Sequence, residues 1–268
     1  PRSFSEEFDG TTLNASRWTV YLENAKGQCG FGVGRYGKCV DENVYLDGEG
    51  ALIIKTDKKS SCSPATGCFN YTSGGVISRG KVDWSVAEGA GYRLCVRAML
   101  PGGGAPGDGA GIWPAHWLMP EAVKDSPAKG SMCDPDGGEI DVLEMVQGNG
   151  QACGTYHWQT TWPTHNCTYP KGHLSVHKCS ALPPNWGSTY HEFAVEHTRD
   201  YLAFVVDGMT MVNTTTAEKT EFSDLPFFLI LNTAVGGTGT WASAPNAATK
   251  FPTYHRIDYV RSSSKAAP

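Results

Sequence analysis

Short apolar runs separated by glycine and proline limit what this chain can fold into more than any other feature of its sequence. The 268 residues include 32 glycines and 16 prolines, scattered between the runs rather than gathered in one segment. This punctuation favours many strands and turns over helices. In residues 92–100 the side chains alternate with period two, which places every second residue on one buried face. We therefore expect an all-β chain of two antiparallel sheets packed as a sandwich.

The candidate strands follow one another with no evident domain boundary, so we expect a single domain over residues 1–262 and a C-terminal tail over 263–268. Residues 146–188 are rich in His, Cys, Trp, Pro and Gly and show little periodicity, which predicts a long ordered loop. Residues 216–222 indicate a short helical turn. The segments expected to form strands are 51–55, 75–78, 92–100, 112–119, 139–146, 191–196, 201–208, 227–234 and 256–261.

The run Glu-Ile-Asp-Val-Leu-Glu at 139–144 places three carboxylates in an otherwise apolar, strand-like segment. Alternation along a strand puts Glu139 and Asp141 on one face. A regular strand would point Glu144 into the core with the apolar side chains, which is costly for an unpaired carboxylate. We therefore predict a β-bulge near residues 142–143 that returns Glu144 to the acidic face.

The spacing of the two glutamates suggests a reaction. At roughly 3.3 Å per residue, the α-carbons of Glu139 and Glu144 lie about 13 Å apart. Their long arms can bring the carboxylates to about 5–6 Å, close to the separation of nucleophile and acid/base in a retaining glycosidase. Asp141 between them can hydrogen-bond the nucleophile and help to keep one neighbour protonated. A three-carboxylate metal site fits the spacing nearly as well, so spacing alone leaves both interpretations open.

Composition and charge limit the classes of molecule that this chain can bind. The formal net charge of −5 gives no basic footprint for nucleic acid or an anionic membrane. The sequence has neither an apolar run of eighteen residues nor a charged-then-apolar leader, so we expect no membrane span and an already processed chain. Eight tryptophans and eleven tyrosines offer flat amphipathic rings, which suit sugar faces as well as a core.

Nine cysteines are many for a cytosolic enzyme, and their spacing is compatible with disulfides. We expect four bridges, with Cys95 as the unpaired thiol; zinc is less favoured because no Cys-x-x-Cys pair occurs. With four glycosylation sequons, at Asn14, Asn70, Asn166 and Asn213, they favour a secreted, extracellular protein. The expected pairs are Cys29–Cys39, Cys62–Cys68, Cys167–Cys179 and Cys133–Cys153.

The acidic run resembles the active-site signature of glycoside hydrolase family 16, in the bulged form typical of its laminarinases. The resemblance implies a concanavalin-like jelly roll with a cleft on its concave face, and a monomeric, retaining endo-glycosidase that hydrolyses β-1,3-glucan of the laminarin type. Hydrolysis of mixed-linkage β-glucan, hydrolysis of galactans and transglycosylation are alternative activities that the acidic run alone does not exclude. A non-catalytic β-glucan-recognition protein on this fold would lack the paired glutamates. Further segments that resemble family landmarks, in the same order, are 4–10 with Trp18, 42–45, 71–74, 111–120, 229–237 and 257–261.

The resemblance also implies roles for single residues: Glu139 as the nucleophile, Glu144 as the acid/base, Asp141 as their orienting neighbour, and His157 as a partner of the acid/base or the substrate. It implies catalysis without a cofactor. One departure is Gly75, where the laminarinase pattern commonly has an arginine. The implied sugar-binding residues are Trp113, Trp117, Asn43, Trp158 and Asn232, and the implied ligands of a structural calcium ion are Asp258, Glu7 and Gly50.

Overall fold

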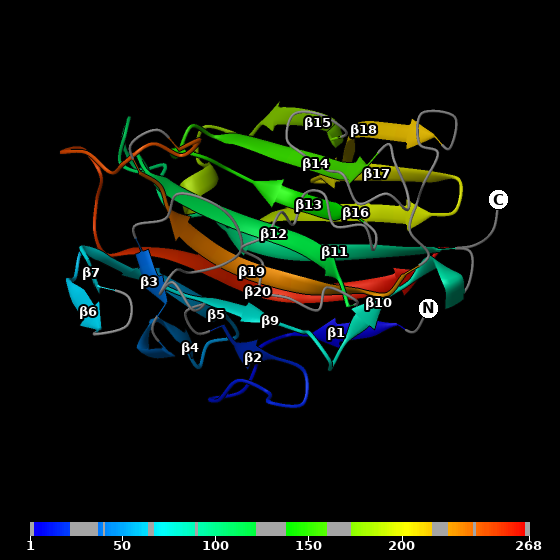
Figure 1. Ribbon diagram of the computed structural model, residues 1–268, viewed down its shortest axis with the longest axis horizontal. Coiled ribbons are helices and arrows are strands. Elements are labelled where there is room, and N and C mark those ends of the chain that lie inside the picture. The colour runs from blue at the N-terminus through cyan, green and yellow to red at the C-terminus, as the bar shows by residue number, and fades with distance from the viewer. Residues whose placement is uncertain are drawn as a thin grey trace.

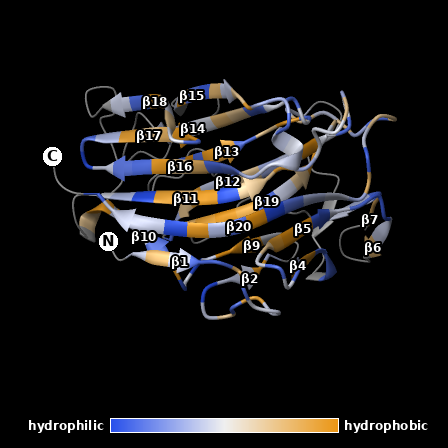
Figure 2. Cartoon of the chain, turned by 180° about the vertical axis from the view of Figure 1, so that it is seen from behind, coloured by the Kyte–Doolittle hydropathy of each residue, from blue (hydrophilic) through white to orange (hydrophobic). Residues whose placement is uncertain are grey.

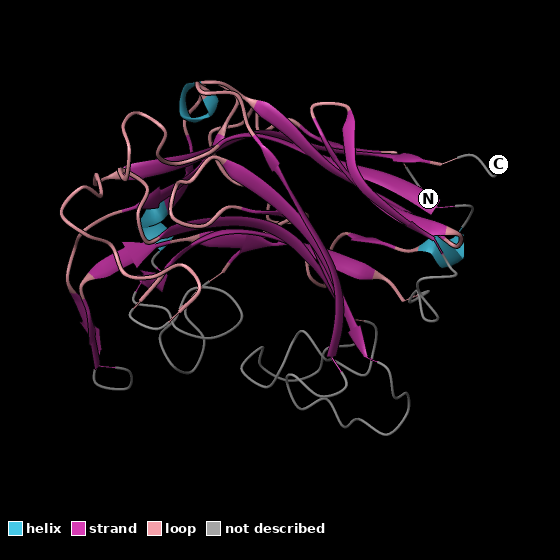
Figure 3. Cartoon of the chain, turned by 90° about the horizontal axis from the view of Figure 1, so that it is seen from above, coloured by secondary structure: helices cyan, strands magenta, loops and turns pink. Residues whose placement is uncertain are grey.

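The fold is known from a computed structural model, which describes residues 3–21, 37–39, 41–63, 67–88, 91–121, 138–159, 173–215, 225–237 and 240–265. Two antiparallel sheets of eight strands each lie face to face, and long strands dominate both of them (Figure 1). Figure 3 shows these strands curving in one sense, with only short helical turns between them. The predicted all-β sandwich is confirmed.

We call the two sheets A and B. The small strands β3 (Gly37–Cys39) and β8 (Tyr71–Ser73), and β6 (Ser61–Ser63) and β7 (Gly67–Phe69), form two further pairs. In the order of pairing, sheet A contains β18 (Met209–Thr215), β17 (Tyr201–Val206), β16 (His191–Thr198), β11 (Gly91–Met99), β20 (Thr253–Ser264), β5 (Leu52–Thr56) and β4 (Val44–Leu46), with β1 (Phe4–Glu6) also on β20. Sheet B contains β15 (His173–Ala181), β14 (Gln151–Gln159), β13 (Glu139–Glu144), β12 (Ile112–Pro120), β19 (Phe227–Val235), β9 (Gly75–Ile77) and β2 (Thr19–Val20), with β10 (Asp83–Trp84) on β19.

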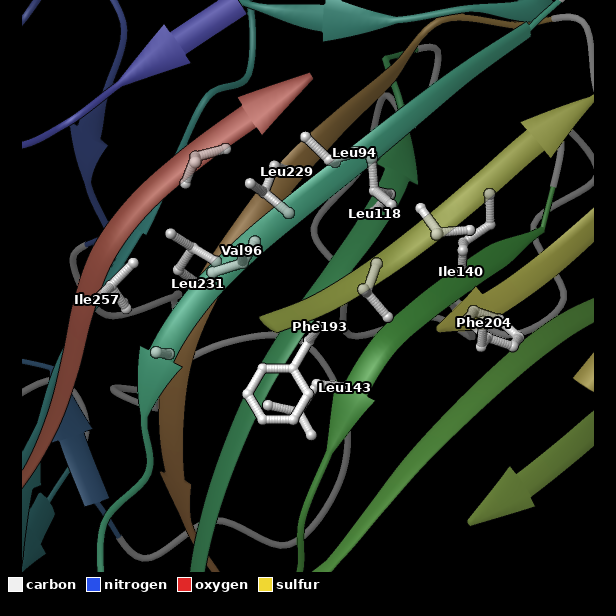
Figure 4. Packing of buried hydrophobic residues seen from close by; sticks show 14 of the residues in the cluster. Leu94, Val96, Leu118, Ile140, Leu143, Phe193, Phe204, Leu229, Leu231 and Ile257 are labelled. Carbon is white, nitrogen blue, oxygen red and sulfur yellow. The ribbon is translucent and has the colours of Figure 1, made fainter. Parts of the chain in front are cut away.

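The core fills the space between the sheets. The alternation predicted for residues 92–100 is confirmed, because Tyr92, Leu94 and Val96 are all fully buried there. Figure 4 shows side chains of both sheets meeting in this layer, among them Leu94 and Leu118. Hydrophilic and apolar residues are interspersed along the strands of sheet A (Figure 2). Each sheet thus turns one apolar face inward. The other faces carry polar groups together with two smaller apolar clusters, which are Ala115, Trp117, Met119, Phe228 and Ile230 on sheet B and Cys95, Ala194 and Val205 on sheet A.

Two expectations about the chain were wrong. Most of the described residues of the expected loop at 146–188 form β14 and β15, which pair along nine residues, and a 3-10 turn at Trp186–Ser188. The final strand continues through Ser264, beyond the expected start of the tail. Two other 3-10 turns are Asp41–Asn43 and Val86–Glu88, and none of the described helices is long and apolar enough to cross a membrane. The helical turn expected at 216–222 lies outside the described residues.

Candidate active site

The acidic strand β13 carries the predicted bulge. Against β12, Leu143 pairs with His116 and Asp141 pairs with Trp117, so one residue of β13, Val142, is extra. The pairing with β14 is shifted over the same stretch. Val142 and Leu143 both enter the core, and Glu144 is only half-buried. The extra residue therefore gives three acids one face, which is the face of sheet B turned away from sheet A.

Cross-strand pairing extends this open face over β14 and β15. Residues directly opposite each other in antiparallel strands have Cβ atoms about 4.5–5.5 Å apart on the same side of the sheet. Each acid of β13 therefore begins a short row of side chains. The three rows are Glu139 with His157 and Ser175, Asp141 with Thr155 and His177, and Glu144 with Cys153 and Cys179.

Asp141 is the most buried of the three acids, with 2% of its surface exposed. Burial raises the pKa of its carboxyl to about 7, and a hydrogen bond with Glu139 acts in the opposite direction. His157 Nε2 lies 3.2 Å from Asp141 Oδ2. Burial lowers the pKa of His157, and the charge of Glu139 opposes this shift, so the imidazole beside Asp141 is neutral near pH 7. Glu139 and Asp141 can share a proton in mild acid.

Glu144 is held from the side of β12. Trp113 Nε1 donates a hydrogen bond to Glu144 Oε1 at 3.0 Å. The indole of Trp241 packs edge-on against Trp113, with ring centroids 5.3 Å apart, and is 48% exposed. On its other side Trp241 meets His177, at 6.3 Å between centroids. Trp113 therefore contacts the acid directly, while Trp241 and His177 continue the chain of rings from it, and these last two residues were not predicted from the sequence.

Trp117 and Asn232 form a buried pair further along the open face. Trp117 Nε1 donates to Asn232 Oδ1 at 2.8 Å, and both residues are buried. Pro114 lies on β12, which has three strands on either side in sheet B, and its carbonyl accepts from Met145 N just beyond the last β12–β13 pair. Its missing N–H therefore falls where the ladder has ended, which explains a proline in a central strand.

The comparisons place these residues in a known family. The family model described as Glycosyl hydrolases family 16 matches residues 97–261, which include β12, β13 and β14. The chain belongs to this family.

Two relatives and one solved structure illustrate the similarity. The chain is 31% identical to glucan endo-1,3-beta-glucosidase A1 of Niallia circulans, over 96% of its own length but 37% of the relative's. It is also 31% identical to a beta-glucanase of Rhodothermus marinus, covering 96% of this chain and 83% of that one. The laminarinase catalytic domain of Thermotoga maritima MSB8 superposes with a TM-score of 0.77 at 27% identity, covering 98% and 97% of the two chains.

The expected sugar-binding residues of this family 16 chain are not all on the open face. Trp158 lies among the core residues, stacked on Tyr156 with centroids 5.1 Å apart. The expectation that Trp158 binds substrate was therefore wrong, because alternation along β14 turns it away from His157. Asn43 is 1% exposed and its amide donates to the Ser73 carbonyl at 3.4 Å, so it is buried in the described arrangement.

Gly75 stands where the family resemblance led us to expect an arginine, and packing explains the glycine. A Cβ added at Gly75 would lie 2.8 Å from Asn232 Cβ and 3.0 Å from the Leu231 carbonyl oxygen. A side chain at this position would push β9 away from β19. Arg79, four residues on, instead places its guanidinium 5.3 Å from the centre of the Phe228 ring.

The predicted calcium ligands do not gather around a cation. Glu7 binds Arg261 through both of its carboxylate oxygens, at 2.8 and 2.7 Å, and this hydrogen bonding lowers the pKa of Glu7. The Asp258 carboxylate pairs with Arg97. Gly50 has φ +94° and lies near Asp9 instead. Because calcium requires several oxygen ligands around one centre, these side chains do not fit the ion as arranged.

The disulfides agree with the sequence only in part. Cys62–Cys68 is formed and Cys95 is unpaired, as predicted. Cys153 bonds to Cys179, so the expected pairs Cys133–Cys153 and Cys167–Cys179 were wrong. These two cysteines face each other across β14 and β15, with α-carbons 4.0 Å apart. The pairing of the two strands was not predicted, because residues 146–188 were expected to form a loop. Cys29, Cys133 and Cys167 lie outside the described residues.

Proposed function

We propose that this family 16 chain is a retaining endo-glycosidase that hydrolyses β-1,3-glucan of the laminarin type. The observation that carries the proposal is the bulge of β13, because it gives Glu139, Asp141 and Glu144 one common face. The same acidic strand without the bulge would point Glu144 into the core. The relative of Niallia circulans and the structure from Thermotoga maritima, named as a glucan endo-1,3-beta-glucosidase and a laminarinase, support the substrate class.

In this proposal Glu139 attacks the anomeric carbon while Glu144 protonates the departing glycosidic oxygen. The bond from Glu139 to the sugar then breaks when a water, deprotonated by Glu144, attacks the same carbon. The hydrogen bond with Asp141 orients Glu139, and the imidazole of His157 on the neighbouring strand lies 3.2 Å from Asp141. The indole N–H of Trp113 fixes Glu144 and stabilises its carboxylate form after proton transfer.

Aromatic side chains beside the acids would bind the glucan. The exposed face of Trp241 and the half-buried ring of Trp113 lie next to Glu144, where they offer flat apolar surface to a pyranose ring. Trp117 is held by Asn232 and is 5% exposed, so it supports this face more than it offers ring surface. The reaction requires no cofactor, and the pairing of Glu7 and Asp258 with arginines leaves calcium out of the proposal.

The stereochemistry of the reaction tests the mechanism. Proton NMR of laminarin oligosaccharides in the first seconds of hydrolysis should show release of the β-anomer, because two displacements at the anomeric carbon give net retention. Initial release of the α-anomer would contradict the assigned roles. Products from laminarin, barley glucan, agarose and carrageenan would separate β-1,3-glucan hydrolysis from cleavage of mixed-linkage glucan or galactans, and oligosaccharides longer than the substrate would indicate transglycosylation.

A non-catalytic glucan-binding protein is the alternative from a different functional class. Retention of all three acids beside an aromatic surface favours the enzyme. Binding of laminarin without any release of reducing ends would favour the alternative. We also propose that the protein is secreted and acts as a monomer; the Cys62–Cys68 and Cys153–Cys179 bridges support an oxidising compartment.

A further inference from the structure

A cluster of metal-ligating side chains lies one strand away from Glu144 and is unused by the proposed reaction. Its members are Cys153 on β14 and His177 and Cys179 on β15. Their sulfur and imidazole ligand atoms all lie within 4.8 Å of one another, and His177 Nε2 lies 3.2 Å from Cys179 Sγ. In the structure the two sulfurs are joined as a disulfide.

The histidine is already oriented as a metal ligand. His177 Nδ1 is 2.9 Å from Thr155 Oγ1, which engages one ring nitrogen and turns Nε2 towards the sulfurs. Metal-bound histidines are commonly fixed in this way, because a hydrogen bond at one nitrogen sets the ring orientation and leaves the other nitrogen for the ion. His177 is exposed and Cys179 is partly exposed, so solutes can reach both.

Reduction would turn this cluster into a complete ligand set. A phosphine supplies two electrons and takes the oxygen of a water molecule to become the phosphine oxide, and the two protons of that water go to the sulfurs, so that the S–S bond breaks and two thiols form. A divalent ion then binds both thiolates and displaces the two protons. Two cysteines and one histidine with a fourth position open are a known zinc ligand set, and thiolates favour zinc and other thiophilic ions.

We propose that reduction of Cys153–Cys179 creates a Cys2His site for a thiophilic divalent cation, and that the bound ion inhibits hydrolysis by taking Glu144 as its fourth ligand. Glu144 is the cross-strand partner of Cys153, so their Cβ atoms lie about 4.5–5.5 Å apart and the longer glutamate arm can reach the ion. A carboxylate bound to the ion cannot protonate a glycosidic oxygen. Only the inhibition rests on the proposed function; the metal binding does not.

The binding is tested by cadmium titration of the full chain after treatment with a water-soluble phosphine. Peptide mass mapping verifies that Cys153 and Cys179 have become thiols, and circular dichroism verifies the fold. The reduced protein should bind one more equivalent of Cd²⁺, seen by thiolate-to-metal absorption, than the Cys153→Ser/Cys179→Ser variant treated identically. His177→Ala should weaken that equivalent by more than about tenfold.

The matched control is Cys62→Ser/Cys68→Ser, which removes the other described disulfide and should leave the additional equivalent intact. Equal cadmium binding by the protein with and without Cys153 and Cys179 would overturn the proposal. So would a chain that cannot be reduced at this bond without unfolding, since the site could then not form in the folded protein.

Inhibition is measured separately with Zn²⁺ on laminarin hydrolysis. Zinc should inhibit the reduced protein, a chelator should restore its rate, and the Cys153→Ser/Cys179→Ser variant should be insensitive. Binding without inhibition would overturn the role of Glu144 as fourth ligand. If the oxidised protein released no sugar from any glucan, the proposed function would fail, while the cadmium result would still decide the metal site.

Discussion

The acids on the outer face of sheet A and those on the open face of sheet B have different partners. On sheet A, Arg93 bonds Glu192 at 2.7 Å and Glu196 at 3.0 Å. On sheet B, Asp141 meets another carboxyl and a histidine, and Glu144 accepts from an indole. An acid beside a guanidinium keeps its charge, whereas an acid beside a carboxyl or an indole can still exchange a proton. The two faces therefore separate carboxylates paired with arginine from those proposed to react.

Removing the proposed catalytic glutamates should have the largest effect. Glu139→Ala should lower kcat for laminarin by at least about 10³-fold, because the covalent step loses its nucleophile. Glu144→Gln should lower it by about 10²–10⁴-fold through loss of the general acid. Initial rates of reducing-end release measure both. Added azide should restore turnover in Glu139→Ala with inversion of the anomeric centre.

The matched control on sheet A is Glu192→Gln, which alters a carboxylate of the same type that is paired with arginine. Its kcat should stay within about twofold of the unaltered protein, since it lies on the opposite side of the core. A large loss of activity in this variant, or a few per cent of activity retained by Glu139→Ala, would break the distinction between the two faces.

Asp141→Asn should lower kcat by about 10²-fold, with a smaller change in KM, because the orientation and proton sharing of Glu139 are altered. It should also stabilise the fold. The folded-state pKa of about 7 lies above the ordinary 3.8, so the folded state binds more protons than the unfolded one and wild-type stability falls as pH rises through this window.

Asparagine removes that contribution. At pH 8 the variant should exceed the unaltered protein by more than about 1 kcal/mol in free energy of unfolding, the equivalent of one pKa unit, and the difference should vanish near pH 4. Urea unfolding at the two pH values measures it. A variant that is less stable at pH 8 would show that Asp141 contributes to the fold as the sheet A acids do.

The strands that could be predicted from the sequence are those with one apolar face and one polar face. Residues 92–100 alternate clearly because their even-numbered side chains enter the core. The bulge of β13 followed from the cost of burying Glu144, and the structure places the extra residue at Val142, within the predicted pair. Burial energetics therefore sufficed for the acidic strand without any knowledge of its neighbours.

The same reasoning failed for β14, because its core face is not uniformly apolar. Gly154 lies on that face, where an added Cβ would be 2.5 Å from Phe204. In the sequence alone, a glycine at this position favours a turn over a strand. Trp158, a residue expected at the sugar, enters the core instead. Trp241 reaches Trp113 and His177 from a loop, and no local spacing predicts contacts between residues so far apart. Long-range packing decides all three positions.

Between the sheets, His116 and His255 form a third kind of titratable pair, buried without any acid. Their Nε2 atoms are 3.0 Å apart, their rings are stacked, and Thr233 Oγ1 lies 3.2 Å from His255 Nδ1. Burial lowers the pKa of His255 to about 3 and also lowers the pKa of His116. The unfolded chain therefore binds more protons below pH 6.5, and stability is lost as pH falls from there to about 3.

His255→Gln should make this acid loss shallower by about one proton, or about 1.4 kcal/mol per pH unit, between pH 6 and pH 4. The measurement is the free energy of unfolding by urea at several pH values, with pH 7.5 as the reference. An unchanged slope would show that other groups govern acid unfolding. The contribution is opposite in sign to that of Asp141, so the Asp141→Asn and His255→Gln variants must be compared separately before they are combined.

Breaking the ion pairs of sheet A should have the smallest effect. The Arg93 side chain is 23% exposed, and water screens its attraction to Glu192 and Glu196. Arg93→Met, which keeps the apolar stem, should lower the free energy of unfolding by about 1 kcal/mol at low salt and by less at high ionic strength. Its kcat/KM on laminarin should be unchanged. If activity fell while the fold remained stable, the charges of sheet A would be coupled to the acids of sheet B through the core, and the carboxylates of the two faces could no longer be treated as independent.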